Sequence, residues 1–499
     1  TRAGRRIVRQ AAPTPAFWAA WKTRKEALKA EGYSVANWEG AWTVSISTVP
    51  TDQIAAPVAT PYVLQPLADP SGLLSWQPEK AAQLAASLRA LGAALDASDT
   101  GTGKTYQALA AVREIGRRAL VIAPLVVLPA WKRAAASLGV ELVSVIDWEK
   151  VRTGRTTWGK WNDLEKPQFV WNVPADVVLI FDEAHRAKTR NTKNSKIVAA
   201  ARRQGVPAVA LSATVVESPL DLDALGYLLG LHDGRKFWDW TKGYGCKPGF
   251  WGGFEFNGDK NQLVRLHAEI FPKRGARTRI ADLGDAFPEN DVHTTLIALD
   301  DLSTRKIDQI YAEMEEELAA LDGKIKEDGD ALPITIRLRA RQKIELLKVP
   351  GLCDLARDTV EEGRTHILFL NFNESVDAAL ELLKDLKPAV IRGGQTAEER
   401  EAEVQRVQTN ATRSAVVNVA AGGLGVGFHD LDGNFPRSSD ICPNDDARMV
   451  IQAFGRIHRA GGKSKCQQRI VGVGGTVEVQ VLENYLDKLG RIQTLNDGQ

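Results

Sequence analysis

Short apolar runs alternate with amphipathic helical patterns along most of this chain. Eight runs have the length of buried strands: residues 119–123, 141–145, 177–181, 208–211, 366–370, 389–391, 415–419 and 469–471. Apolar runs of this length, separated by helical segments, are typical of parallel strands covered on both faces. The pattern therefore predicts an α/β protein with two parallel-sheet lobes in tandem.

Changes in composition along the chain suggest four regions. Residues 1–65 form a basic, Trp-rich accessory module, and residues 66–235 carry the first series of strands. Residues 236–290 are rich in glycine and aromatic residues, which indicates an insertion between the lobes. Residues 291–499 carry the second series.

The first region combines basic residues and tryptophans and leads into a proline-rich stretch. Its tryptophans are at positions 18, 21, 38 and 42, and the prolines are at 50, 57, 61, 66 and 70. Prolines favour an extended, semi-rigid backbone, which suits a linker. Interleaved basic and aromatic residues can bind nucleic acid by phosphate pairing and base stacking. A solvated basic tail followed by a small Trp-packed domain accounts for the composition equally well.

Composition excludes several classes of protein. A chain of 499 residues is long enough for two or three domains. Its formal net charge is only +2, so a nucleic-acid surface must come from local charge arrangement. Neither a membrane-spanning apolar run nor a secretory signal is recognisable, so we expect no membrane role and no export. The four widely spaced cysteines suit neither a metal site nor a disulfide framework, which favours reduced thiols and a cytoplasmic location.

The most informative motif is a glycine-rich loop that ends in Lys-Thr. Glycines let backbone N–H groups close around phosphate oxygens, Lys104 supplies a charge for the β- and γ-phosphates, and the Thr105 hydroxyl is placed to meet Mg²⁺. Ser98 stands where the usual pattern has glycine. Helical patterns are expected before the loop, over 79–91 and 93–95, and after it, over 106–115. We therefore predict an ATP site whose cradle consists of Thr100, Gly101, Thr102, Gly103, Lys104 and Thr105.

A second motif, Asp182-Glu183-Ala184-His185, directly follows the apolar run 177–181. Ligands bind at the carboxyl ends of strands in open α/β sheets, so two carboxylates are expected there. We expect Asp182 to hold Mg²⁺ and Glu183 to polarise the attacking water. The predicted metal ligands are thus Thr105 and Asp182.

A third motif, late in the chain, contains Gln452, Arg456 and Arg459. Two arginines three residues apart on a helix share one face, so both are expected to point across a cleft at a γ-phosphate. The predicted catalytic residues are therefore Lys104, Asp182, Glu183, Gln452, Arg456 and Arg459.

Together these motifs resemble those of superfamily-two helicase-type ATPases, and within them the SWI/SNF-like branch of double-stranded DNA translocases. The resemblance covers about residues 73–490. Further segments that carry it are 73–77, 121–125 with Trp131, 212–214, 277–279 with Asp282 and Pro288, 367–372, 393–400 and 421–425.

The resemblance implies two RecA-like lobes with ATP bound between them. It assigns Gln77 to the adenine edge, adds Gly425 to the nucleotide site, and makes Arg456 and Arg459 arginine fingers, which are worth roughly 10³ to 10⁵ in turnover in related phosphoryl transfer. Residues 121–125, followed by Trp131, resemble the first DNA-backbone motif of that branch.

We therefore expect an ATP-dependent translocase of double-stranded or branched DNA, with ATP and Mg²⁺ as cofactors. Fork remodelling, branch migration and repair are its expected outputs, in a bacterial or phage-infected cell. A strand-separating helicase on RNA or DNA shares every catalytic motif and is the main alternative. A nucleic-acid-binding scaffold that uses ATP only to lock its conformation is an alternative of another class.

Overall fold

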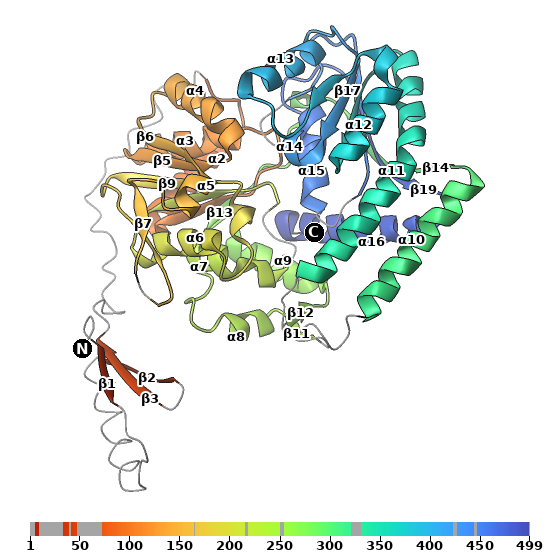
Figure 1. Cartoon of the computed structure of the whole chain (residues 1–499). Helices are drawn as coiled ribbons and strands as arrows, with labels where there is room; N and C mark the ends of the chain where they lie inside the picture. The colour runs from red at the N-terminus through yellow and green to blue at the C-terminus, as the bar shows by residue number, and fades with distance from the viewer. Residues whose placement is uncertain are drawn as a thin grey trace. The chain divides into compact units, whose positions relative to one another are not determined.

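The computed structural model describes residues 5–8, 33–38 and 41–46, and residues 72–498 except 164, 215–217, 250–253, 321–330, 423–426 and 444–446 (Figure 1). The chain divides into two compact units, Thr1–Val63 and Leu64–Gln499. In the first unit, strands β1 (Arg5–Val8), β2 (Tyr33–Trp38) and β3 (Ala41–Ile46) form an antiparallel sheet in the order β1-β3-β2. Trp18, Trp21 and the proline-rich stretch lie outside the described residues.

The second unit contains two six-stranded parallel sheets, each of which forms the centre of one lobe. In lobe 1 the strands lie in the order β13 (Gly275–Ala276), β4 (Ala93–Asp96), β10 (Ala208–Leu211), β9 (Val177–Asp182), β5 (Arg118–Ala123) and β6 (Leu142–Asp147). The predicted strands at 119–123, 141–145, 177–181 and 208–211 are confirmed, with bounds that differ by up to two residues.

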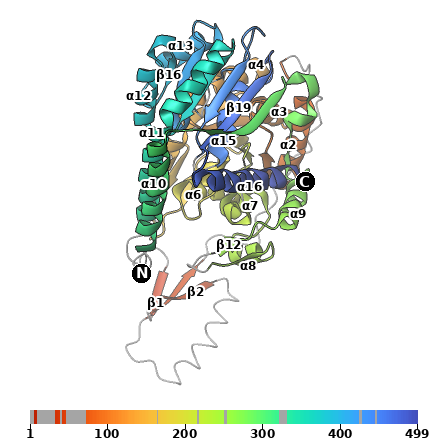
Figure 2. The same ribbon diagram turned by 90° about the vertical axis from the view of Figure 1, so that its right-hand side faces the viewer.

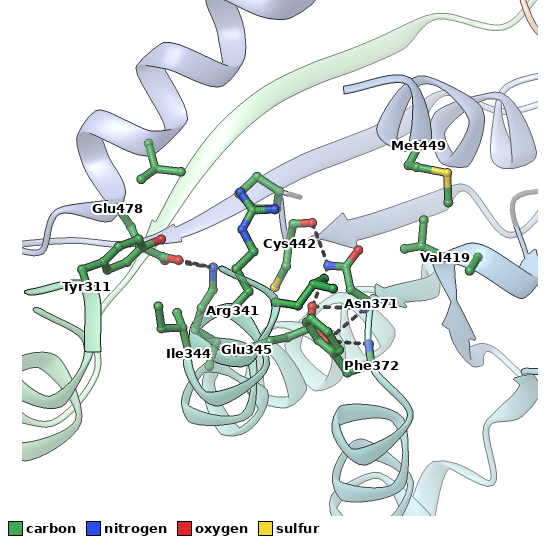
Figure 3. A pocket seen from close by; sticks show the side chains of 15 residues that line it. Tyr311, Arg341, Ile344, Glu345, Asn371, Phe372, Val419, Cys442, Met449 and Glu478 are labelled. Atoms are coloured by element: carbon green, nitrogen blue, oxygen red, sulfur yellow. Dashed lines mark hydrogen bonds and ion pairs between the residues drawn. The ribbon is translucent and has the colours of Figure 1, made fainter. Parts of the chain in front are cut away.

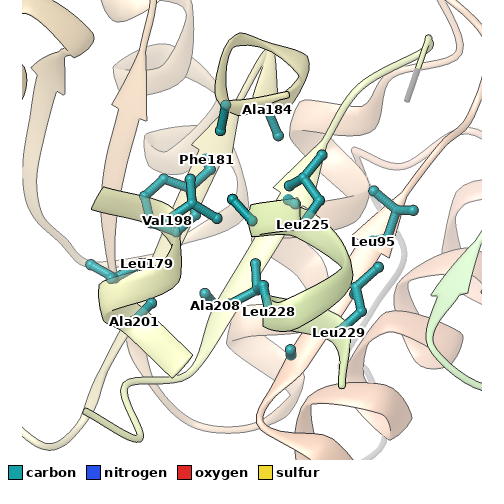
Figure 4. Packing of buried hydrophobic residues seen from close by; sticks show 14 of the residues in the cluster. Leu95, Leu179, Phe181, Ala184, Val198, Ala201, Ala208, Leu225, Leu228 and Leu229 are labelled. Carbon is teal, nitrogen blue, oxygen red and sulfur yellow. The ribbon is translucent and has the colours of Figure 1, made fainter. Parts of the chain in front are cut away.

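Helices cover both faces of the lobe 1 sheet. One face packs on α2 (Gln77–Leu91), α3 (Lys104–Glu114) and α4 (Leu128–Leu138). The other packs on α5 (Trp148–Arg152), α6 (Lys193–Arg203) and α7 (Asp223–Leu229). Figure 4 shows side chains of α6 and α7, such as Val198 and Leu225, against Leu179 and Phe181 of β9. Burial on both faces explains why these strands are uninterrupted apolar runs.

The helical prediction for residues 93–95 is wrong, because these residues form β4, which leads directly into the phosphate loop. Alanine gives a weak strand signal, and a four-residue run is too short to show a period. Gly92, with φ 69°, ends α2 and separates it from the strand. The phosphate loop therefore directly follows a strand, β4, which the sequence pattern did not predict.

The region between the lobes, predicted as an insertion, forms part of lobe 1. It contains α8 (Phe237–Lys242), the hairpin β11 (Cys246–Pro248) and β12 (Phe254–Phe256), and α9 (Lys260–Ile270). α9 packs into the lobe 1 core, and β13 pairs with β4 at the edge of the sheet. A further antiparallel pair, β7 (Gly159–Trp161) and β8 (Phe169–Trp171), lies outside the main sheet.

Lobe 2 repeats the architecture. Its strands lie in the order β14 (Asn290–Ile297), β19 (Cys466–Val473), β18 (Arg437–Ile441), β15 (Thr365–Leu370), β17 (Ser414–Asn418) and β16 (Ala389–Ile391). All the described pairings are parallel. β14 and β18 had not been predicted, because polar residues such as Ser438 and Asp440 hide β18 although all five of its residues are buried.

The helices of lobe 2 again lie on both faces of its sheet. α10 (Asp301–Ala320), α11 (Ala331–Glu361) and α12 (Asn373–Leu382) cover one face. α13 (Ala397–Gln408), α15 (Ala447–Ile457) and α16 (Glu478–Asp497) cover the other, and α14 (Val419–Gly422) is a single turn after β17. α16 runs from lobe 2 to α9 of lobe 1 (Figure 2). The fold is therefore two RecA-like parallel-sheet lobes in tandem, as predicted.

Short 3₁₀ helices complete the described structure: η1 (Leu125–Val127), η2 (Ala184–Ala187), η3 (Pro219–Leu222), η4 (Ile280–Asp282), η5 (Gly284–Ala286) and η6 (Lys384–Leu386). Within the described part of the chain, no helix is both long and apolar enough to cross a bilayer.

Candidate nucleotide-binding site

The phosphate loop connects β4 to the first turn of α3. Gly101 and Gly103 have φ near +90°, a conformation that favours glycine. The Lys104 Nζ donates hydrogen bonds to the Ser98 and Asp99 carbonyl oxygens at 2.8 and 3.1 Å. The loop is thus folded around the amino group, and the first N–H groups of α3, as at other helix N-termini, are suited to phosphate.

Gln77 holds the loop from the side of α2. Its Nε2 donates to the Thr102 carbonyl at 3.0 Å, and its Oε1 accepts from the Leu74 N–H at 2.9 Å. The side chain is buried, and Trp76 Nε1 donates to the same Thr102 carbonyl at 3.1 Å. The oxygen and the nitrogen of the Gln77 side-chain amide therefore both bind the backbone and hold the phosphate loop in place. Its bond to adenine stays a prediction.

Asp182 lies at the end of β9, where two tryptophans orient it. Trp131 Nε1 donates to Asp182 Oδ2 at 2.9 Å, and Trp148 Nε1 donates to the Asp182 carbonyl at the same distance. Burial, reinforced by the neighbouring Glu183 carboxylate, raises the pKa of Asp182 to about 6. The ring of Trp131 is buried and lies behind the nucleotide site, and the resemblance of residues 121–125 to a DNA-backbone motif stays a prediction.

Glu183 has φ 52° and ψ 48°, a left-handed backbone conformation that is uncommon for a residue with a side chain. Its Oε2 accepts a hydrogen bond from Gln452 Nε2 of α15 at 3.3 Å and lies 3.3 Å from His185 Nδ1. The same His185 nitrogen lies 3.1 Å from Ser212 Oγ. Burial raises the pKa of Glu183, while Lys104 opposes that shift. Glu183 is therefore linked both to lobe 2 and to Ser212, the first residue of the Ser-Ala-Thr segment (212–214).

The two arginines do not share a helical face. α15 ends at Ile457, so Arg459 lies beyond the helix, and this prediction from spacing is wrong. Burial lowers the pKa of Arg456 to about 10, with the nearby Arg459 lowering it further and Glu183 opposing. Arg459 covers the loop, since a Cβ added to Gly101 would lie 3.3 Å from Arg459 Cγ. Two desolvated guanidinium groups beside the loop favour an anion there.

α15 packs directly on the phosphate loop. A Cβ added to Gly455 would overlap the side chain of Thr100. Within the described residues, the buried Thr100 Oγ1 has no hydrogen-bond partner. The lobes are therefore in contact over the loop, with a buried hydroxyl that can accept or donate a bond there.

The structure brings together most of the residues predicted from the sequence. One assembly contains Gln77, Thr100, Gly101, Thr102, Gly103, Lys104, Thr105, Asp182, Glu183, Gln452, Arg456 and Arg459. Gly425 lies outside the described residues. In the described ranges no cluster of three or more His, Cys, Asp or Glu side chains could hold a metal by itself. A cation at Thr105 and Asp182 would therefore need water or phosphate ligands as well, as Mg²⁺ ordinarily does.

Sequence reasoning did not assign a role in the nucleotide site to the residues that hold this assembly from behind. Trp131 and Trp148 orient Asp182, and Arg277 Nη1 lies 2.7 Å from Asp99 Oδ1 in the phosphate loop. A polar partner could have been predicted for the tryptophans, because a buried indole N–H normally finds a hydrogen-bond acceptor. No local pattern connects Arg277 with Asp99, which lies far earlier in the chain.

A groove of about 650 Å³ crosses from lobe 1 to lobe 2. Lobe 1 contributes Val126, next to Leu125, which is 66% exposed. The rest of the lining comes from lobe 2: Gln342, Asn371, Phe372, Asn373, Glu374, Gly393, Arg400, Asn418, Ala420 and Ala421. Most of these residues follow the carboxyl ends of β15, β16 and β17, where ligands bind in open α/β sheets.

A cavity of about 270 Å³ lies next to this groove in lobe 2 (Figure 3). Glu345 of α11 accepts hydrogen bonds from the Asn371 N–H at 2.9 Å and Asn371 Nδ2 at 2.6 Å. It also accepts a bond from the Phe372 N–H at 3.2 Å. The cavity wall therefore fixes two residues that line the groove.

A protein family, a viral protein and a solved structure are similar to this chain. The family described as helicase conserved C-terminal domain matches residues 347–461. A protein of Acanthamoeba polyphaga mimivirus, named "Putative ATP-dependent RNA helicase", is 30% identical over 438 residues, which cover 81% of this chain and 80% of that protein. Among solved structures, the Sulfolobus solfataricus SWI2/SNF2 ATPase core in complex with dsDNA aligns with 88% of this chain and 96% of its own, at 15% identity and a TM-score of 0.35. The chain belongs to the superfamily-two helicase-type ATPases, enzymes that bind nucleic acid and remodel it with ATP.

Proposed function

We propose that this protein is a translocase that moves along double-stranded DNA, with branched DNA as its physiological substrate. The observation that carries the proposal is the groove whose lining comes from both lobes. A nucleic acid held by both lobes moves relative to one of them whenever the lobes open or close. The motifs that resemble the SWI/SNF-like branch favour duplex DNA as the track.

The lining of the groove suits the nucleic-acid backbone better than the bases. Four of its six polar side chains are amides, and Asn418 Nδ2 donates to Asn373 Oδ1 at 3.3 Å, which fixes both groups. Amides and backbone N–H groups usually contact phosphate and sugar, which carry no sequence information. We therefore expect little sequence preference.

Arg400 is the cation that fits a phosphate in this groove. Its buried Nε has no hydrogen-bond partner within the described residues. Burial lowers the pKa of Arg400, because a partly buried guanidinium loses hydration, and an anionic phosphate would compensate for that lost hydration. A contact of this kind adds to affinity for any sequence and weakens with salt.

The nucleotide site supplies the chemistry for such movement. Lys104 and the start of α3 would hold the phosphates, and Thr105 with Asp182 would hold Mg²⁺, which neutralises charge on the β- and γ-phosphates. Glu183 would orient the attacking water. Arg456 and Arg459, which come from lobe 2, would stabilise the charge that develops in the transition state only when the lobes are together.

An RNA helicase is the second candidate function, because the mimivirus relative is named as one. It would use the same nucleotide site, and the groove would then hold one strand of RNA. The two candidates differ in which nucleic acid stimulates ATP hydrolysis and in whether strands separate.

The test measures steady-state ATP hydrolysis with blunt duplex DNA, single-stranded DNA, duplex RNA and single-stranded RNA of equal length. The proposal predicts the strongest stimulation by duplex DNA, together with displacement of a third strand from a DNA triplex and no separation of the duplex. Stimulation by RNA alone, or by single strands alone, would overturn it.

A matched pair of variants tests the groove. Arg400→Gln should reduce the slope of log affinity against log salt on duplex DNA by roughly 0.9, the value for one lost phosphate contact. Lys384→Gln, which removes a charge from an exposed pair with Glu381, is the control and should leave the slope unchanged. Equal slopes for Arg400→Gln and the wild type would place the backbone contact elsewhere.

A further inference from the structure

The C-terminal helix α16 belongs to both lobes. At its start, Glu478 forms a buried ion pair with Lys348 of α11 at 2.9 Å, and Leu482 packs in the lobe 2 core. At its end, Leu495 packs in the lobe 1 core, and its carbonyl oxygen lies 2.9 Å from His267 Nδ1 of α9. A helix of 20 residues is about 30 Å long, which is enough to connect the two cores.

The last two residues of α16 contact two segments of the nucleotide site. Asn496 Nδ2 donates to the carbonyl oxygen of Ala213, in the Ser-Ala-Thr segment, at 3.0 Å. Asp497 Oδ1 accepts from Arg277 Nε at 2.9 Å and from Arg277 Nη2 at 2.7 Å. Both contacts cross from a helix of lobe 2 to lobe 1.

Arg277 continues the connection to the phosphate loop. Its Nη1 lies 2.7 Å from Asp99 Oδ1 and also donates to the Ala97 carbonyl oxygen. The Asp99 carbonyl oxygen in turn accepts from Lys104 Nζ at 3.1 Å. The side chains of Arg277 and Asp497 are only 11% and 9% exposed, so solvent screens their attraction weakly.

We propose that Asp497 is a positioning residue for ATP, acting through Arg277 on the phosphate loop. The guanidinium presents its donors in a fixed fork, so a carboxylate that binds one edge determines where the other edge points. Without the Asp497 carboxylate, the buried charge of Arg277 has one partner fewer, and the fork can turn away from Asp99 and Ala97. The end of α16 thereby links the position of lobe 2 to the shape of the loop that receives ATP.

The experiment compares Asp497→Asn with Asp487→Asn in the full chain. Asp487 lies on the same helix and is exposed, so its variant controls for a lost negative charge on α16. Asp497→Asn is expected to raise the KM for ATP roughly tenfold, within the usual range of coupling between sites, and to weaken binding of a fluorescent ATP analogue to the same extent. Asp487→Asn should keep the wild-type KM. Equal values of KM for the two variants would overturn the proposal.

A double variant separates positioning from a general loss of structure. Partial unfolding lowers the active fraction and hence the apparent kcat, but it leaves KM unchanged for the molecules that remain folded. If Asp497 acts through Arg277, then Asp497→Asn in an Arg277→Gln background should raise KM no further. Additive effects on KM would contradict that route.

Asp497→Glu provides the test if Asp497→Asn does not fold. It keeps the carboxylate but moves it by one methylene group, so its KM should lie above that of the wild type; a wild-type KM would overturn the proposal. These measurements use basal hydrolysis and nucleotide binding without nucleic acid. Their outcome is therefore independent of whether the track is DNA or RNA.

Discussion

Gln452 Nε2 of lobe 2 donates a hydrogen bond to Glu183 Oε2 of lobe 1 at 3.3 Å. The bond crosses the cleft and reaches the carboxylate that also lies 3.3 Å from His185, which itself contacts Ser212. Movement of α15 therefore changes the surroundings of Glu183 directly. This relationship gives the nucleotide site a route by which lobe position affects hydrolysis.

Glu183→Gln should abolish most ATP hydrolysis while leaving ATP binding intact. The amide keeps the size of the side chain but cannot polarise water as a base, and general base catalysis typically contributes about 10²- to 10⁴-fold. Steady-state turnover measured beside equilibrium titration with a fluorescent ATP analogue checks both expectations. Near-normal turnover of the purified variant would contradict the assigned role.

Arg456→Ala should lower kcat by roughly 10³-fold, as loss of an arginine finger does in related enzymes. Affinity for ATP should fall much less, because a finger acts mainly on charge that develops in the transition state. Arg456→Lys is the matched control, since it keeps the charge and loses the planar fork. Equal losses in affinity and in kcat would instead assign Arg456 to ground-state binding.

The sequence motifs located the nucleotide site, while most supporting contacts could not be predicted. Asp182 and Glu183 follow a predicted strand, so their place at the edge of the sheet follows from sheet topology, whereas Lys104 is located by the glycine-rich pattern around it. The bond between Asp497 and Arg277 joins residues 220 positions apart, and it depends on where α16 ends. Local periodicity carries no information about such a contact.

Two errors in the predicted structure also arise because local sequence does not determine tertiary packing. β4 is a four-residue Ala-rich strand, and its burial comes entirely from neighbouring strands and helices. The spacing of Arg456 and Arg459 suggested one helical face, but α15 ends at Ile457. Tertiary packing decided both cases against the local pattern.

Gly455→Ala should hinder contact between the lobes and lower kcat, because a Cβ at this position would overlap Thr100 in the phosphate loop. Gly490→Ala, in the exposed part of α16, is the control, since a Cβ there meets nothing within 4 Å. The control should stabilise the protein by up to about 1 kcal/mol, the helix preference for alanine over glycine. Thermal unfolding and steady-state turnover of both variants provide the comparison, and a Gly455→Ala enzyme with wild-type kcat would show that this contact is not needed.

Trp131→Phe should shift the acidic limb of the pH profile to higher pH. The pKa of Asp182 is about 6, and the hydrogen bond from Trp131 lowers it by stabilising the carboxylate. Activity that needs the ionised form declines as the pH falls through this value, and loss of the bond moves the decline upward. Profiles of kcat/KM should be measured at limiting Mg²⁺, because a bound cation competes with the proton. If the acidic limb of Trp131→Phe lay at the same pH as that of the wild type, Asp182 would not control this limb.

Deletion of residues 1–63 should weaken binding to duplex DNA and flatten its dependence on salt. The deletion follows the boundary between the two compact units, and every described residue of the nucleotide site lies after it, so basal ATP hydrolysis should survive. The reason for the expected loss is the mixture of arginines and tryptophans in this segment, which suits phosphate pairing and stacking. Each phosphate contact removed should lower the slope of log affinity against log salt by roughly 0.9.

A segment that is only a solvated tail would leave both affinity and slope unchanged. Superimposable salt titrations of the full and shortened chains would therefore rule out a role in DNA binding.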